Sequence, residues 1–123
     1  MSKSVLLVDD NRVARLMLRM VIAELRPDWT IAEAQNGEDA LAMAARDRFD
    51  VLLVDVGLPG MSGLEVAARL KEHFPDSALA MVTANIQKPV RDRAAALGAA
   101  FIEKPLRPET LLEFFTRSEA SHG

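Results

Sequence analysis

The apolar residues of this chain fall into short continuous runs that alternate with longer segments of helical spacing. The runs are four to six residues long and rich in Val, Ile, Leu and Ala, which is typical of strands covered on both faces. We predict strands at residues 5–8, 29–34, 51–54, 79–82 and 99–102. The run at 29–34 is the weakest, and we expect it near an edge of the sheet.

The segments between these runs place apolar residues every three or four positions, as in amphipathic helices. Asp10-Asn11 offers caps for the first helix, and Ser62 with Glu65 has the form of a capping box. The fourth helix has few large apolar side chains and should be held less tightly. The side chains expected to face inward are Val13, Leu16, Met17, Met20, Val21 and Leu25; Leu41, Ala44 and Ala45; Leu64, Val66, Ala67, Leu70 and Phe74; Val90 and Leu97; and Leu111, Leu112 and Phe115.

Regular alternation of strands and helices predicts an α/β fold, with a parallel sheet covered by helices on both faces. Right-handed crossovers then bring the carboxyl ends of all strands to one edge of the sheet. The chain has 123 residues, half of them apolar, which suits one domain with a sizeable core. We place this domain at residues 4–117 and expect a polar, frayed tail at 118–123.

Composition narrows the function classes. The net charge of −3, without a basic run, gives no reason to expect nucleic acid as a partner. The absence of cysteine excludes disulfides, thiolate metal sites and cysteine catalysis in this chain. The first apolar run is too short for a signal peptide or a membrane span, so we expect a cytoplasmic protein without membrane contact.

Polar residues whose side chains could bind a ligand or take part in a reaction follow four of the predicted strands. Asp9 and Asp10 follow the first strand, Asp55 the third, Thr83 the fourth and Lys104 the fifth. In a parallel sheet these side chains converge on one edge, where open α/β sheets place their chemistry. Three neighbouring carboxylates repel one another, and a divalent cation relieves that repulsion. A cluster of Asp without His or Cys favours Mg²⁺ over zinc.

The same residues suit phosphoryl transfer. Lys104 supplies a positive charge and Thr83 a hydroxyl donor, which the outer oxygens of a phosphoryl group require. Asp55 stands alone after a central strand and is the best nucleophile for a covalent aspartyl phosphate. Taken singly, Asp10 is more typical of a helix cap, Thr83 of a loop hydroxyl and Lys104 of a solvated side chain. Their common placement at strand ends favours the site.

Four segments carry a resemblance to a known family: LVDDN at 7–11, LVDVGLPGMSG at 53–63, VTA at 82–84 and EKP at 103–105. In them the chain resembles the receiver domain of two-component response regulators, and the likeness extends over residues 5–115. The resemblance implies a doubly wound, flavodoxin-like sheet of five strands in the order 2-1-3-4-5. It also implies a regulator of the stand-alone kind known from chemotaxis and phosphorelays.

The resemblance implies a phosphorylatable switch. Asp55 would receive a phosphoryl group from a histidine kinase or a histidine phosphotransfer protein in a Mg²⁺-dependent reaction. Asp10, Asp55 and the backbone carbonyl of Gly57 would ligate Mg²⁺ directly, and Asp9 would act mainly through a bound water. The chain would promote only its own phosphorylation and dephosphorylation and would not otherwise be an enzyme.

The resemblance also assigns the phosphate contacts and the switch. Lys104, the Thr83 hydroxyl and the Ala84 N–H would contact the phosphoryl group, and Lys104-Pro105 would be a cis peptide. The added negative charge would draw Thr83 toward it. Phe101 would then turn inward and change the surface of the fourth helix, fifth strand and fifth helix. From the residues alone, Phe101 also fits a plain core aromatic.

Partners and lifetime follow from the same resemblance. We expect a downstream target protein contacted directly, with the chain as a monomer or weak dimer. The sequence shows no DNA-binding segment after the domain, so we expect either a stand-alone receiver or one domain of a longer protein, and the start at Met1 favours the first. Arg12, Arg15 and Arg19 form a basic stripe on the first helix, either a docking surface for the phosphodonor or a solvated face. Gly57 and Asn85 occupy positions that tune phosphoryl lifetime, and Gly57 suggests a short one.

Three alternatives stay open. A Mg²⁺-dependent phosphohydrolase of the aspartyl-phosphate type would need its nucleophile two residues before a second Asp, which Asp9-Asp10 does not provide. A flavin-binding electron carrier would need a phosphate-binding loop rich in Ser, Thr and Gly after the first strand. A degenerate receiver that only binds proteins would not need the complete set of Asp9, Asp10, Asp55, Thr83 and Lys104.

Overall fold

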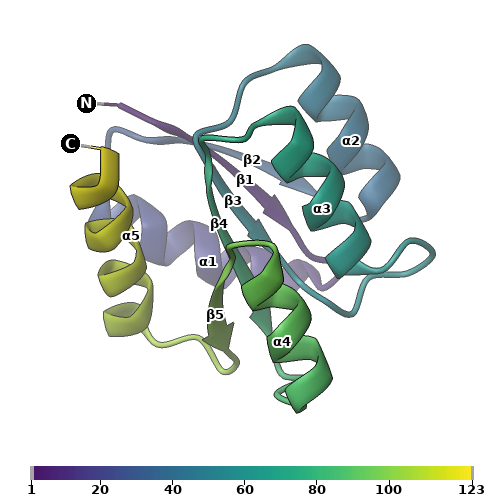
Figure 1. The fold of residues 1–123 in the computed structure, drawn as a ribbon. Helices are drawn as coiled ribbons and strands as arrows, with labels where there is room; N and C mark the ends of the chain where they lie inside the picture. Colours follow the sequence, from purple (N-terminus) through teal and green to yellow (C-terminus); the bar gives the residue numbers. More distant parts are fainter. Residues whose placement is uncertain (1, 123) are drawn as a thin grey trace.

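The computed structural model describes residues 2–122 of the chain, and the side chains of residues 2–120. Within this range the strands form one parallel sheet in the order β2-β1-β3-β4-β5 (Figure 1). Their bounds are Ser4–Val8 for β1, Thr30–Ala34 for β2, Val51–Val54 for β3, Ala78–Thr83 for β4 and Ala100–Glu103 for β5. The predicted sheet, its order and the edge position of the second strand are confirmed.

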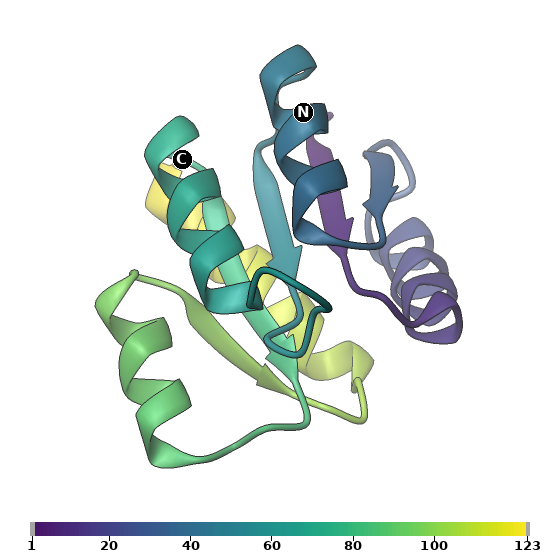
Figure 2. The same ribbon diagram turned by 90° about the vertical axis from the view of Figure 1, so that its right-hand side faces the viewer.

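One helix follows each strand: α1 Arg12–Leu25, α2 Gly37–Arg46, α3 Gly63–His73, α4 Lys88–Ala96 and α5 Pro108–His122. Helices α2, α3 and α4 cover one face of the sheet, and α1 and α5 cover the other (Figure 2). None of the helices in the described part of the chain has the length and apolar content needed to cross a membrane.

The central strands β1 and β3 are buried on both faces. Leu6 and Leu52 enter the cluster under α2 and α3, whereas Leu7 and Leu53 enter the cluster under α1 and α5. The sheet ladder continues one residue past each strand, because Asp55 N donates to the Val8 carbonyl at 2.9 Å and Asp9 N donates to the Ala34 carbonyl at 3.1 Å. The two acids therefore leave the sheet from rigid backbone.

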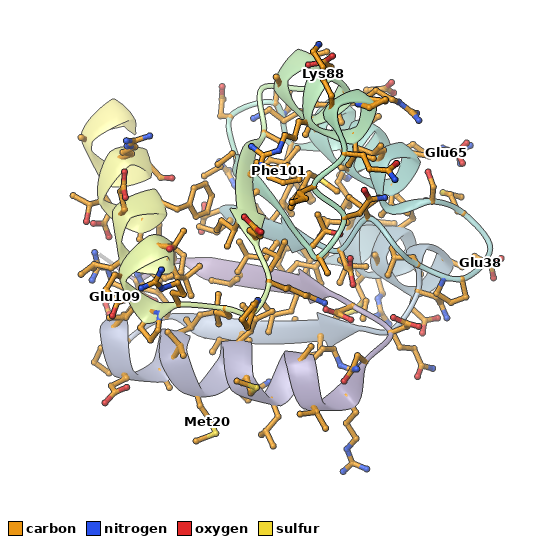
Figure 3. The ribbon with its side chains drawn as sticks, turned by 90° about the horizontal axis from the view of Figure 1, so that it is seen from below. Met20, Glu38, Glu65, Lys88, Phe101 and Glu109 are labelled. Carbon is orange, nitrogen blue, oxygen red and sulfur yellow. The ribbon has the colours of Figure 1, made fainter. Side chains whose placement is uncertain are left out.

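Helix α1 is oriented differently from our prediction. Leu18 and Ile22 form its buried side, with Val21 and Leu25 packed beside them. The expected inward residues Val13, Leu16, Met17 and Met20 are instead exposed, and Met20 points away from the sheet in Figure 3. Because apolar residues surround most of this helix, their spacing was compatible with more than one buried face.

Two smaller assignments were also wrong. Ala45 is exposed, and Ala40 takes the buried position in α2. Leu112 is exposed, and Phe114 is buried in its place in α5. The other predicted residues of these two helices are confirmed, because Ala44, Leu111 and Phe115 are buried and Leu41 is partly buried. The predicted residues Leu64, Val66, Ala67 and Leu70 of α3 are also buried.

The end of α5 is anchored. We expected residues 118–123 to fray. Gly123 lies outside the described residues, but the helix continues to His122, and Ser118 is buried. Nε and Nη2 of Arg26, at the end of α1, each donate to a carboxylate oxygen of Glu119 at 2.8 Å. The Arg26 guanidinium also lies 5.7 Å from the ring centroid of Trp29, whose ring is 4.7 Å from that of Phe115. These contacts join the ends of α1 and α5.

Helix α4 has the weakest attachment, as predicted. Of its side chains in the described structure, Ala94 alone is buried, while Val90 and the following Leu97 are partly buried. Its N-cap residue, Gln87, makes no capping hydrogen bond through its side chain in the structure described here.

Candidate functional site

Three strands bring charged side chains together at the carboxyl edge of the sheet. Nζ of Lys104, after β5, lies 2.8 Å from Oδ2 of Asp9 and 2.9 Å from Oδ2 of Asp55. The Lys104-Pro105 peptide is cis, as predicted. The structure thus brings together residues that are far apart in the sequence but share this edge.

The two bridged carboxylates are each held by a second donor. Oδ1 of Asp9 accepts from the backbone N–H of Asn11 at 2.9 Å, and Oδ1 of Asp55 accepts from that of Gly57 at 3.1 Å. The Asp9 side chain is 2% exposed and that of Asp55 is 12% exposed. Asp55 is therefore the more accessible of the two, while both have fixed orientations.

The ammonium of Lys104 is stabilised by these neighbours. Burial acts to lower its pKa, but the hydrogen bonds and charges of Asp9 and Asp55 outweigh burial and raise the pKa above its ordinary value. Lys104 therefore stays charged at neutral pH. It offsets part of the repulsion between the acids and provides a positive charge beside the Asp55 carboxylate.

A metal ion fits the acidic side of this site. Asp9, Asp10 and Asp55 can each offer a carboxylate oxygen, and the three oxygens lie within 4.8 Å of one another. Asp9 is buried, whereas Asp10 is exposed, so the cluster opens to solvent. A hard divalent cation with oxygen ligands, such as Mg²⁺, suits this donor set.

Thr83 and Ala84 complete the edge on the side of β4. Thr83 is buried, its Oγ1 accepts from the N–H of Asn85 at 3.1 Å, and its carbonyl accepts from Lys104 N at 2.9 Å. Ala84 is exposed. In the described structure no hydrogen bond joins the Thr83 hydroxyl to Asp55.

Phe101 lies on β5 next to α4 (Figure 3) and is partly buried. The guanidinium of Arg91, in α4, lies 4.9 Å from the centre of its ring. Nε of Arg91 also donates to the Ile86 carbonyl in the loop before α4, at 3.2 Å. The Phe101 ring is thus only partly buried in the core and is covered by Arg91. Its role as a switch stays a prediction.

Gly63 is a site residue whose role the sequence reasoning missed. A Cβ at this position would lie 1.8 Å from the carbonyl oxygen of Asp55, so only glycine allows α3 to begin there. Gly63 N also donates to the Val56 carbonyl at 2.9 Å. A glycine directly after the helix cap Ser62 was the available signal, because glycine is unfavourable inside helices. At Gly57, by contrast, the nearest contact of a Cβ is Asp55 Oδ1 at 4.0 Å.

The predicted basic stripe on α1 is partly neutralised, because Arg15 and Arg19 share one carboxylate. Nε of Arg15 donates to Glu33 Oε1 at 3.0 Å, and Nε of Arg19 donates to Glu33 Oε2 at 2.8 Å. Burial acts to raise the pKa of Glu33, but the two arginines outweigh it and lower the pKa. Arg12 remains exposed. The outer surface of α1 is accordingly more apolar than basic.

The family model described as the response regulator receiver domain matches residues 5–116 of this chain. The chain belongs to the response regulator receiver family. It is therefore a phosphorylatable switch of two-component signalling, and the predicted fold, flavodoxin-like and doubly wound, is that of its relatives.

Named relatives agree with this assignment. Response regulator UvrY of Escherichia coli (strain K12) is 31% identical to this receiver over 86 residues, which are 70% of this chain and 39% of UvrY. The protein-glutamate methylesterase/protein-glutamine glutaminase 3 of Hahella chejuensis is 43% identical over 83 residues, 66% of this chain and 23% of that protein. The receiver thus spans less than two fifths of the length of these relatives.

A solved structure matches the receiver over nearly its full length. The chemotaxis protein CheY4 of Vibrio cholerae is 30% identical, with a TM-score of 0.85, and the match covers 96% of this chain and 99% of that chain. The activities in these names differ between relatives, so the receiver itself is the shared part.

Proposed function

We propose that this receiver accepts a phosphoryl group on Asp55 in a Mg²⁺-dependent reaction and passes the signal to a partner protein through its α4-β5-α5 surface. The observation that carries the proposal is the Lys104 ammonium, which joins Asp9 and Asp55 while Asp10 lies within reach of both acids. The phosphodonor is a histidine kinase or a histidine phosphotransfer protein, and the receiver works in the cytoplasm.

The transfer step uses Asp55 as the nucleophile. An Oδ atom of Asp55 forms a bond to the phosphorus of a phosphohistidine, the phosphorus–nitrogen bond breaks, and the electron pair leaves with the histidine nitrogen. Asp10, Asp55 and the carbonyl of Gly57 would hold Mg²⁺, with Asp9 acting through water. The bound ion would neutralise charge on the transferring phosphoryl group. Its ligand atoms are all oxygen, which agrees with the cluster described above.

The residues on the other side of Asp55 would bind the product. Lys104 already lies 2.9 Å from an Asp55 oxygen, so its ammonium is placed to contact a phosphoryl oxygen attached there. The Thr83 hydroxyl accepts one hydrogen bond from Asn85 N and still has its proton to donate. The N–H of Ala84 is the third donor in this proposal.

The conformational response would begin at Thr83. A phosphoryl group adds close to two negative charges, to which the Thr83 hydroxyl moves. Phe101 then turns inward, leaving the Arg91 guanidinium that now lies over its ring. The loose attachment of α4 supports this assignment, because few buried contacts resist its movement.

The phosphodonor would dock on the exposed apolar side of α1. Val13, Leu16, Met17 and Met20 are each about half exposed or more, and the helix begins two residues after Asp10. An exposed apolar patch of this kind marks a protein contact, and the helix that carries it starts directly after the loop of Asp9 and Asp10. This patch replaces the basic stripe as the proposed docking surface.

The decisive experiment is incubation with Mg²⁺ and acetyl phosphate, followed by intact mass measurement. We expect one phosphoryl adduct, which should not form when Mg²⁺ is chelated before acetyl phosphate is added and should be absent from Asp55→Asn. An adduct that survives Asp55→Asn would move the acceptor to another residue. No adduct on the wild-type chain, and no spectral change with beryllofluoride, would favour the binding-only alternative.

Lifetime can be tested on the same adduct. Gly57 leaves open space beside Asp55, and we propose that this exposes the phosphoryl group to water and shortens its life. Replacing Gly57 by Asn or Lys should slow hydrolysis of the adduct. An unchanged hydrolysis rate in both variants would contradict this part of the proposal.

A further inference from the structure

The loop that carries Asp9 and Asp10 is held from outside the acidic cluster. The carbonyl oxygen of Asp9 accepts a hydrogen bond from Nη1 of Arg15 at 2.6 Å. That oxygen belongs to the planar peptide group joining Asp9 to Asp10, so its position sets the direction in which Asp10 leaves the strand. Arg15 thereby contacts the backbone of the site without touching any carboxylate of the cluster.

Arg15 is itself fixed by a second contact. Its side chain is 14% exposed, and its Nε donates to Oε1 of Glu33 on β2. The other oxygen of Glu33 accepts from Arg19, which also donates to the Ile31 carbonyl at 3.2 Å. A planar guanidinium can make two such directed bonds at once, whereas a lysine ammonium is a point charge on a flexible stem.

We propose that Arg15 is a positioning residue for the Mg²⁺ site. It fixes the Asp9–Asp10 peptide so that both carboxylates face Asp55, and Glu33 holds the guanidinium in the orientation this requires. The inference rests on the proposed Mg²⁺-dependent function, and it adds residues of α1 and β2 to the machinery at the carboxyl edge.

Charge and geometry predict opposite effects when Arg15 is removed. If Arg15 acted only through its charge, its loss would strengthen Mg²⁺ binding, because a positive charge repels a cation. If Arg15 acts by holding the peptide, its loss lets Asp10 reorient and weakens binding. Groups that orient metal ligands from the second layer change affinity by about 10–100-fold, and the charge of Arg15 is partly offset by Glu33, which Arg15 shares with Arg19. Geometry should therefore dominate.

The test is a Mg²⁺ titration of Arg15→Met and Arg19→Met. The NMR signals of the Asp55 and Gly57 amides are the measure of binding. Both variants remove one arginine from Glu33 and one positive charge from the same helix, but only Arg15 contacts Asp9. We expect Arg15→Met to bind Mg²⁺ about tenfold more weakly. Arg19→Met should stay close to wild type. Arg15→Lys keeps the charge and should still be weakened.

Phosphorylation gives a second measurement. At saturating Mg²⁺ the rate with acetyl phosphate should return close to the wild-type rate in Arg15→Met, because the defect lies in binding the ion. Urea unfolding of both methionine variants establishes that they are folded under the titration conditions. A general loss of α1 packing would weaken both variants alike.

Three results would overturn the inference: Mg²⁺ binding by Arg15→Met at or above wild-type strength, equal weakening in the two methionine variants, or wild-type binding by Arg15→Lys. Failure of the wild-type chain itself to bind Mg²⁺ would remove the proposed function together with this inference. The wild-type titration therefore separates the two failures.

Discussion

Helices α3 and α4 each follow a strand that ends in a site residue, yet the two are held very differently. α3 buries its inner side chains from Leu64 to Leu70, and the Ser62 hydroxyl accepts from the Glu65 N–H at its start. In the described structure α4 buries Ala94 alone, and Gln87 provides no side-chain cap. The protein thus combines a firmly packed helix and a loosely packed one at the same edge of one sheet.

The contrast continues into the site. α3 begins in direct contact with the backbone of Asp55, where Gly63 leaves no space for a side chain. The segment before α4 follows Thr83, whose hydroxyl accepts a hydrogen bond from the N–H of Asn85 in that segment. The α3 half of the site, which holds Asp55, is thus preorganised. The α4 half, which follows Thr83 and would respond to phosphorylation, is held by fewer contacts. The following experiments test this division.

The largest effect is expected at Gly63. Gly63→Ala would place a Cβ against the Asp55 carbonyl, and backbone cannot yield as a flexible side chain can. We expect a loss of about 4 kcal/mol in the free energy of unfolding, measured in urea. Gly57→Ala is the matched control and should unfold like wild type, since its Cβ has only an ordinary contact. Equal stability of the two variants would contradict the assigned rigidity of this half.

Truncating one leucine in each helix compares their packing directly. Leu70 of α3 is fully buried, and Leu70→Ala should cost about 3 kcal/mol of unfolding free energy. Leu97, at the end of α4, is partly buried, and Leu97→Ala should cost about 1 kcal/mol. Amide hydrogen exchange should also be faster in wild-type α4 than in α3. A cost at Leu97 as large as that at Leu70 would remove the contrast.

Lys104 links the two halves, and its contribution depends on pH. Its pKa is raised in the folded chain, so its stabilising effect is complete below 10.5, the ordinary lysine value, and is lost as pH rises through the higher folded value. Lys104→Met should lower the unfolding free energy by about 2 kcal/mol at neutral pH in the absence of metal.

That deficit should shrink as pH rises above 10.5. Urea unfolding of both proteins between neutral and strongly alkaline pH measures it, and the comparison cancels the titration of the other lysines. The chain has no tyrosine to titrate in the same range. A deficit that stays constant across this range would show that the ammonium charge is not its source.

The caps should give the smallest effects, of opposite sign. Ser62→Ala removes the cap of α3 and should cost about 1 kcal/mol. Gln87→Ser supplies α4 with the kind of cap it lacks in the described structure, and should add up to about 1 kcal/mol. Thermal or urea unfolding of the two variants measures both. No gain from Gln87→Ser would mean that α4 is loose for reasons other than its cap.

The sequence predicted what depends on local pattern and on the rules of parallel sheets. The strands and the meeting of Asp9, Asp55 and Lys104 follow from short apolar runs that end in polar residues. The resemblance supplied the order and the cis peptide before Pro105. These features do not depend on which side chains meet across the core, and that is why they could be predicted.

What could not be predicted depends on long-range contacts. Spacing alone did not select the buried side of α1, because apolar residues lie on most of its sides and the sheet decides between them. The pairing of Arg15 with Glu33 joins a helix to an edge strand, and that of Arg26 with Glu119 joins residues 93 positions apart. The second pairing attaches to α1 a residue that the pattern had placed in a frayed tail.

The packing of Trp29 gives the receiver a built-in optical probe. It is the only tryptophan in the chain, and its ring packs at a tilt against Phe115 and near the Arg26 guanidinium. Because it directly precedes β2, it lies at the amino edge of the sheet, opposite the phosphoryl site. Its emission should therefore report on the packing between the ends of α1 and α5, at the edge of the sheet away from Asp55. A steady signal during phosphorylation would mean that the response does not reach this edge, and a shifted one would show that it had crossed the molecule.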